Sequence, residues 1–188
     1  MSPREQIVDA AVRLFFTQGY AATGINQLID ASGVAKRTFY HHFPSKEAVG
    51  EAYLDLAASR WLSGIRDAAR GRRTTHGVVH AVFGFARAFA EETHFRGCGI
   101  LNLAAEFADA GAPMRGRVAD HKEAQRTLLR ELLVPLGASP GDADAVHVLL
   151  EGAIAGASAH RDVWPIRAAE GAATAVVQAA HATTKGRP

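Results

Sequence analysis

The apolar residues of this chain recur at the spacing of helices, and Val, Ile and Thr do not gather in alternating runs. Alternation indicates a half-buried strand, whereas a period of three to four residues indicates an amphipathic helix. Ala and Gly are abundant, and 48% of the residues are apolar, which excludes global disorder. The sequence therefore predicts an all-α protein.

The first helix is expected from residue 3 onward, because residues 2–5 form a capping box with Pro at the first helical position. Gly19 supplies the stop for this helix. Two short helices are predicted next, over about residues 24–32 and 36–43. Thr23 is placed to cap the first of the two.

The break between the two short helices contains Gly33, and two helices joined by such a turn are typical of a helix-turn-helix. In this motif the second helix enters the major groove of DNA. Phe39 and Phe43 form an apolar side that is expected to pack on the first helix. The outer side mixes cations with groups that donate and accept hydrogen bonds, as base edges and phosphates require. It consists of Lys36, Arg37, Thr38, Tyr40 and His41.

The next helix, expected over about residues 45–70, adds a second contact with DNA. Its first N–H groups are unpaired and Lys46 lies in the first turn, which favours a bound phosphate. The net charge of the chain is only +2, and so small a charge does not indicate nucleic acid by itself. The DNA-binding prediction therefore depends on where the cations lie, and a solvated basic surface on a helical bundle is the alternative.

Composition and the absence of certain motifs argue against several other classes of function. Cys98 is the only cysteine, which excludes an intrachain disulfide and a metal site built from several cysteines. Neither a signal peptide nor an apolar run of membrane-spanning length is recognised, so a cytoplasmic protein is expected. The sequence patterns of zinc metalloproteases, P-loop proteins and serine hydrolases are missing. We expect no enzyme activity, no metal and no cofactor.

One set of residues has a spacing that is known from other proteins. It consists of Gly19-Tyr20, Thr23, residues 25–29, Ala31, residues 32–34, residues 38–43 and Lys46-Glu47. This set resembles the N-terminal signature of the tetracycline-repressor (TetR) family, and the match covers about residues 5–50. The resemblance implies an all-α homodimer that binds a roughly palindromic DNA operator and holds a ligand in its C-terminal body.

Carried over position by position, the resemblance implies roles for individual side chains in DNA binding. Base contacts are implied for Lys36, Arg37, Thr38 and His41, and contacts with the phosphate backbone for Thr23, Tyr40 and Lys46. The chain departs from the family at two places. Ala35 stands where the family most often has Ser, so the third helix lacks a side-chain cap. Arg37 stands where the family often has Gly.

The chain is expected to divide into a helix-turn-helix head at residues 1–60 and a helical ligand-binding and dimerisation body at residues 61–188. Large apolar residues of the body are candidates for a ligand pocket, together with a few polar residues that orient the ligand. The apolar candidates are Trp61, Phe83, Phe85, Phe89, Phe107 and Trp164, and the polar candidates are Asn102, Glu106 and His121. For each of them, an ordinary place in the core or on a helix surface is the alternative.

The last two predicted helices, over about residues 142–161 and from residue 165 onward, carry faces that are dominated by small residues. The first face consists of Leu149, Gly152, Ala153, Gly156, Ala157 and His160. The second consists of Ile166, Ala169, Ala173, Val176 and Ala180. Paired across a two-fold axis, they predict a four-helix dimer interface. Packing of both helices on the body of the same chain is the alternative.

Together these features predict a ligand-responsive DNA-binding repressor that a small hydrophobic or amphipathic effector releases from its operator. An alternative of the same fold is a redox- or electrophile-sensing repressor, because Cys98 lies between two glycines and close to the cation of Arg96. A helical binding module that has lost DNA binding is a further alternative. It requires the basic surface to be covered or neutralised, and the sequence shows no such loss.

Overall fold

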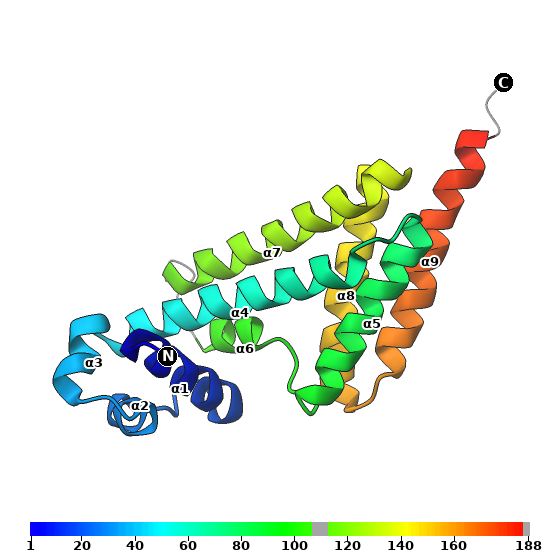
Figure 1. Ribbon diagram of the computed structural model, residues 1–188. Coiled ribbons are helices and arrows are strands. Elements are labelled where there is room, and N and C mark those ends of the chain that lie inside the picture. Colours follow the sequence, from blue (N-terminus) through cyan, green and yellow to red (C-terminus); the bar gives the residue numbers. More distant parts are fainter. Residues whose placement is uncertain (107–112, 186–188) are drawn as a thin grey trace. The chain divides into compact units, whose positions relative to one another are not determined.

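The structure is a computed structural model that describes residues 1–106 and 113–185, with the side chains of residues 1–106 and 114–179. Every regular element in these ranges is helical, as the sequence predicts (Figure 1). The helices are α1 (Pro3–Gln18), α2 (Ile25–Ser32), α3 (Lys36–His42), α4 (Lys46–Ala69), α5 (Thr75–Glu92), α6 (Gly99–Ala105), α7 (Pro113–Leu133), α8 (Pro140–His160) and α9 (Trp164–Lys185), with a 3-10 turn η1 (Val134–Leu136) before α8.

The chain forms two compact units. The head unit comprises residues 1–59 and 99–120, and the body unit comprises residues 60–98 and those from 121 onward. Helices α4 and α7 are continuous and contribute one part to each unit. In this division α6 and the start of α7 group with the head unit, and the assignment of DNA binding to residues 1–60 and of ligand binding and dimerisation to residues 61–188 remains a prediction.

Two helices begin at the same kind of cap. Ser2 Oγ accepts a hydrogen bond from the N–H of Glu5, whose carboxylate accepts one from the N–H of Ser2, so the predicted capping box of α1 is confirmed. Ser139 and Asp142 repeat the arrangement around Pro140. Helix α8 therefore begins two residues earlier than predicted, because the cap at Ser139 was not recognised in the sequence.

The head unit buries one face of each of its first helices. In α1 the buried residues are Ile7, Val8, Ala10, Ala11 and Phe15. Phe39 is completely buried and Phe43 nearly so, and α3 packs on α1 as predicted. The start of α7 is fastened to α4 by Arg117, whose guanidinium donates to Asp55 at 2.8 Å and to Glu51 at 3.1 Å.

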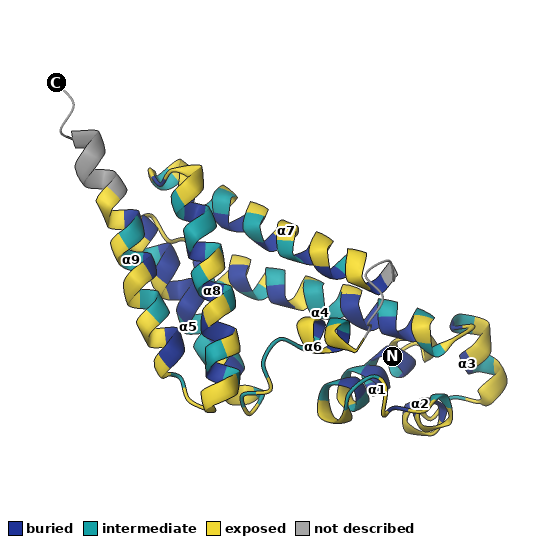
Figure 2. Ribbon diagram, turned by 180° about the vertical axis from the view of Figure 1, so that it is seen from behind, coloured by how far each residue is buried: buried dark blue, intermediate teal, exposed yellow. Residues whose placement is uncertain are grey.

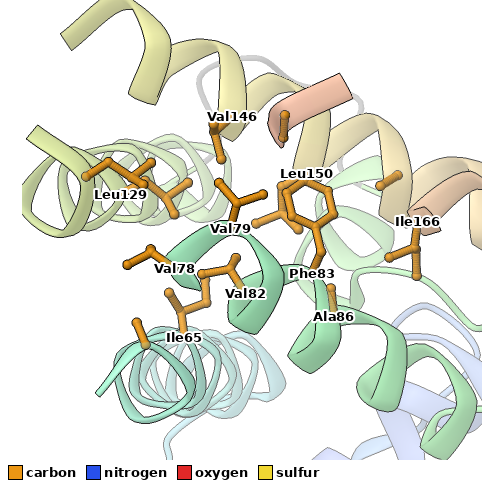
Figure 3. Packing of buried hydrophobic residues seen from close by; sticks show 14 of the residues in the cluster. Ile65, Val78, Val79, Val82, Phe83, Ala86, Leu129, Val146, Leu150 and Ile166 are labelled. Atoms are coloured by element: carbon orange, nitrogen blue, oxygen red, sulfur yellow. The ribbon is translucent and has the colours of Figure 1, made fainter. Parts of the chain in front are cut away.

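The body unit has a core built by α5, α8 and α9 with the adjoining parts of α4 and α7. Figure 3 shows Val79 and Phe83 of α5 beside Leu150, and Val82 on the side of α5 that lies near Ile65 of α4. Helices α8 and α9 are antiparallel neighbours that pack closely on each other and on α5. At one crossing Gly156 meets Pro165, where an added Cβ would lie 2.9 Å from the proline Cβ.

This packing corrects part of the predicted dimer faces. Ala153, Ala157, Ile166 and Ala173 are buried in the core of the same chain. The intrachain alternative therefore holds for these four residues, because each faces a neighbouring helix of the body unit. The side chain of Ala180, also assigned to the second face, lies outside the described side chains.

Candidate DNA-binding surface

The turn between α2 and α3 has the geometry of a helix-turn-helix. Helix α2 ends at Gly33, whose φ of +68° lies in the left-handed region that glycine adopts without strain. Ala35 precedes α3 and gives it no side-chain cap, as expected from the sequence. Since α1 and α2 pack together and α1 also packs on α3, the two short helices are presented by α1.

Helix α3 separates its side chains as predicted. Phe39 and Phe43 point into the head unit, whereas the other side of the helix is exposed (Figure 2). Lys36, Arg37 and His41 are exposed, Tyr40 is 39% exposed, and Thr38 is half-buried. These residues form the recognition face. The individual base and phosphate contacts assigned to them remain predictions.

Thr23 does not lie on this surface. Its side chain is completely buried, its hydroxyl donates to the carbonyl oxygen of Gly19 at 2.7 Å, and it accepts from Gln18 at 3.0 Å. The predicted phosphate contact of this side chain does not fit its placement, because the side chain is completely buried and its hydroxyl is already engaged. The predicted cap is also corrected, since the N-cap of α2 is Gly24 and makes no side-chain hydrogen bond.

Lys46 lies at the start of α4 as predicted, but its ammonium is engaged within the head. Nζ donates to the carbonyl oxygens of Tyr20 at 3.0 Å and Thr23 at 3.1 Å. It also lies 4.2 Å from the centroid of the Tyr20 ring. Two of the three ammonium donors are therefore used to hold the α1–α2 turn.

The same turn is bound by Glu106, which sequence reasoning had assigned to a ligand pocket. The carboxylate accepts hydrogen bonds from the N–H groups of Tyr20 at 2.9 Å and Ala21 at 2.5 Å. Burial raises the pKa of the Tyr20 phenol, with smaller contributions from the charges of Glu47 and Glu106. Glu106 thus lies in the head unit, and this placement does not fit the predicted role in a body pocket.

The body unit holds a polar cluster that is centred on Gln125 of α7. The indole of Trp61 donates to Gln125 Oε1 at 2.7 Å. The amide nitrogen of Gln125 donates to Glu151 Oε1 at 2.9 Å and lies 3.1 Å from His147 Nδ1. Lys122 forms an ion pair with Glu151 at 2.7 Å. We call these five residues the body polar cluster.

Aromatic rings cover the Trp61 side of this cluster. The centroid of the Trp61 ring lies 5.0 Å from that of Phe85 and 5.1 Å from that of Phe89. Phe85 approaches α4 so closely that a Cβ on Gly64 would overlap its ring. Three of the predicted pocket residues are therefore brought together, next to polar groups that the sequence analysis had not selected.

His121 lies one helical turn before Gln125 on α7. Its side chain is only 6% exposed, and Nδ1 has no hydrogen-bond partner among the described residues. Burial lowers the pKa of His121 to about 4, helped by the charges of Lys122 and His147 and opposed by that of Glu151. The ring is therefore neutral near pH 7, with an unsatisfied nitrogen inside the body.

The remaining pocket candidates have different surroundings. Phe83 is completely buried in the core. Trp164 is 52% exposed and packs beside His160, with ring centroids 4.9 Å apart, which does not fit a place in a pocket of this chain. Asn102 is exposed on α6 in the head unit. Phe107 lies outside the described residues.

The missed residues of the body polar cluster had a recognisable signal. His121 and Gln125 are four residues apart, as are His147 and Glu151, so each pair lies on one helix face. Polar pairs on faces that are otherwise apolar mark a buried network. The sequence analysis selected Trp61 and the neighbouring His121, but not the polar residues Lys122, Gln125, His147 and Glu151.

Cys98 is half-buried, and the Lys122 ammonium lies 3.8 Å from its sulfur. In the part of the chain that the structure describes, three or more His, Cys, Asp or Glu side chains never gather into a group that could bind a metal ion. None of the described helices is long and apolar enough to span a membrane.

Comparisons with known proteins agree with this arrangement. Residues 7–53 match the bacterial regulatory proteins of the tetR family, and residues 75–172, just over half of the chain, match the C-terminal domain of LmrA/YxaF-like transcriptional regulators. The HTH-type transcriptional regulator LmrA of Bacillus subtilis is 56% identical over 41 residues, which are 22% of each chain. The HTH-type transcriptional activator FasR of Mycolicibacterium smegmatis is 35% identical over 86 residues, 44% of this chain and 39% of FasR.

These sequence matches cover well under half of each relative, whereas a solved structure matches almost the whole chain. A TetR-family transcriptional regulator from Streptomyces coelicolor has a TM-score of 0.84 and 26% identity, with 95% of both chains covered. All of these proteins are transcriptional regulators, which confirms that the chain is of a non-enzymatic family. The chain belongs to the TetR family of DNA-binding transcriptional regulators, with a C-terminal domain of the LmrA/YxaF-like type.

Proposed function

We propose that this regulator is a homodimeric repressor that leaves a palindromic operator when a small hydrophobic or amphipathic effector binds its body unit. The observation that carries the proposal is the recognition face of α3. Its exposed cations and hydrogen-bonding groups lie on a helix whose other side is fixed by Phe39 and Phe43. Such a face fits the major groove, where donors and acceptors distinguish the bases. The proposed place of action is the bacterial cytoplasm, where the DNA lies.

Dimerisation is supported by the small residues that α8 and α9 leave uncovered. On α8 a stripe at helical spacing is exposed, and it consists of Val148, Gly152, Ala155 and Ala159. On α9 a similar stripe consists of Ala168, Gly171, Ala172 and Ala175. Small residues let helices of two copies approach closely, and a two-fold axis then places two recognition faces on one DNA site. These stripes replace the partly buried faces that the sequence indicated.

Effector binding is supported by the unsatisfied nitrogen of His121. A buried polar atom without a partner costs about 1–3 kcal/mol, so a ligand that donates to or accepts from Nδ1 gains this amount. Trp61 binds Gln125, one helical turn after His121, and its ring together with those of Phe85 and Phe89 offers apolar contact. An effector that is partly apolar and carries a hydrogen-bonding group fits this combination.

Repression is the usual mode of action in this family and is proposed here on that basis. FasR is named an activator, so whether this protein represses or activates transcription needs its own measurement. A reporter gene placed behind the selected operator is suitable for this. The thiol-sensing alternative gains no support from the structure. Cys98 has Lys122 as a neighbour, but that ammonium is paired with Glu151 at 2.7 Å.

The decisive experiment has two steps. DNA that binds the full-length protein is first selected from a random pool, and a compound from a thermal-shift screen is then titrated with and without this DNA. Reciprocity requires that the DNA weaken compound binding by the same factor by which the compound weakens DNA binding. Equal affinities in the two titrations would show that the compound is not an effector. A selected site without two-fold symmetry would contradict the palindromic operator.

A further inference from the structure

The turn between α1 and α2 is held from two sides within the head unit. Lys46 of α4 binds the carbonyl oxygens of Tyr20 and Thr23. Glu106, which directly follows α6, binds the N–H groups of Tyr20 and Ala21. A carboxylate that accepts from two backbone amides makes charge-assisted hydrogen bonds, which are stronger than neutral ones.

Gly19 makes room for this carboxylate. Its φ of +94° is strained for any residue with a side chain. A Cβ at this position would also lie 3.1 Å from Glu106 Oε1. The end of α1 is therefore shaped so that the carboxylate can reach the two amides that follow.

We propose that Glu106 is a positioning residue for DNA binding, because its carboxylate fixes the turn from which α2 and α3 begin. The N-cap of α2 is Gly24, only three residues after Ala21, and α3 follows after one further turn. A change in the direction of the α1–α2 turn would therefore change the orientation of α2 and α3, and with it that of the recognition face. Holding such groups in the productive geometry is what supporting residues contribute to a binding site.

The direction in which DNA affinity changes when the Glu106 carboxylate is removed distinguishes a positioning residue from a simple surface charge. Glu106 is exposed and negatively charged in the unit that binds DNA. If it were only a charge, phosphates would repel it, and its removal would tighten DNA binding. If it positions the turn, its removal must weaken DNA binding although a negative charge is lost.

The test uses the full-length protein without any effector. Glu106→Gln and Glu106→Ala are compared with Glu47→Gln. Glu47 is a matched control because its charge, like that of Glu106, raises the pKa of Tyr20, while the turn amides are held by Glu106. Affinity for selected DNA is measured at two salt concentrations, and hydrogen exchange of the Tyr20 and Ala21 amides is measured by nuclear magnetic resonance.

We expect Glu106→Gln to weaken DNA binding and to speed exchange at Tyr20 and Ala21, each by about tenfold, since a hydrogen bond to a charged group contributes about 1.5 kcal/mol or more. Glu106→Ala is expected to have a larger effect, and Glu47→Gln to leave exchange unchanged. The salt dependence is expected to stay the same, because no phosphate contact is removed. Tighter or unchanged DNA binding, unchanged exchange at the turn, or faster exchange over the whole chain would each overturn the proposal. Since no effector is used, failure of the effector site would leave this result untouched.

Discussion

The ammonium of Lys46 lies 4.2 Å from the centroid of the Tyr20 ring and donates to the Tyr20 carbonyl oxygen at 3.0 Å. A cation over an aromatic ring and against a backbone carbonyl is part of the fold of the head unit. We therefore predict that Lys46→Met lowers the free energy of unfolding by about 1–3 kcal/mol, because charged hydrogen bonds are lost. Thermal unfolding of the full-length protein measures this. If Lys46→Met instead left stability unchanged and reduced the salt dependence of DNA binding by one phosphate contact, Lys46 would be a phosphate ligand.

The recognition face gives a second prediction. At least one alanine substitution among Lys36, Arg37, Thr38 and His41 should cost about 1–3 kcal/mol on the selected DNA and relax the preference at defined base positions. Arg73→Ala is the control, since Arg73 is an exposed cation of the body unit. Selection of DNA by each variant, followed by sequencing, measures the preference. If all four variants keep the affinity and preference of the parent, α3 does not read bases.

The exposed stripe of α8 gives a third prediction. Gly152→Glu should convert the dimer to monomers and weaken binding to palindromic DNA, because an added Cβ meets nothing within 4 Å in this chain and the carboxylate would disturb only a second copy. Gly116→Glu is matched to it, since Gly116 is also helical, exposed and open to an added Cβ. Light scattering measures the mass of both variants. A Gly152→Glu protein that is still dimeric would place the interface elsewhere.

The burial of His121 gives a prediction about pH. The pKa is near 6.5 in the unfolded chain and about 4 in the folded one, so the unfolded state binds more protons between these values. The neutral ring therefore makes its full contribution to the free energy of unfolding above pH 6.5. This contribution is lost as the pH falls towards 4, by roughly 3 kcal/mol in total. His121→Phe should flatten the decline of unfolding free energy between pH 7 and pH 5, as measured by urea unfolding. A variant whose stability declines as steeply as that of the parent would contradict this.

The helices of this chain and the exposed side of α3 were predictable because they depend on local patterns. Caps, glycines and apolar periodicity act over a few residues, and these determined α1, α2 and α3 to within one residue. Burial of Thr23 was not predictable in this way. Its hydroxyl is bound by Gly19 and Gln18, and a threonine before a helix has the same local signal whether it caps that helix or turns inward.

Contacts between distant segments explain the other differences. The sequence predicts Glu106 as a polar group of a body pocket, with a helix surface as the alternative, yet Glu106 binds Tyr20 and Ala21 near the start of the chain. Gly156 was assigned to the dimer interface from its small size, but Pro165 of the same chain occupies that side. A small residue permits close approach of any helix, so the sequence alone does not tell which helix approaches.

The two tryptophans have opposite surroundings, so the intrinsic fluorescence of the protein can report ligand binding. Trp61 is 9% exposed and donates to Gln125, whereas Trp164 is 52% exposed and lies beside His160. Fluorescence of an indole shifts to longer wavelength as water reaches it, so the two residues emit in different parts of the spectrum. The Trp164→Phe protein keeps one tryptophan, Trp61 of the body polar cluster. With excitation that tyrosine does not absorb, a compound that binds there is expected to change the wavelength or intensity of the Trp61 emission without any attached dye.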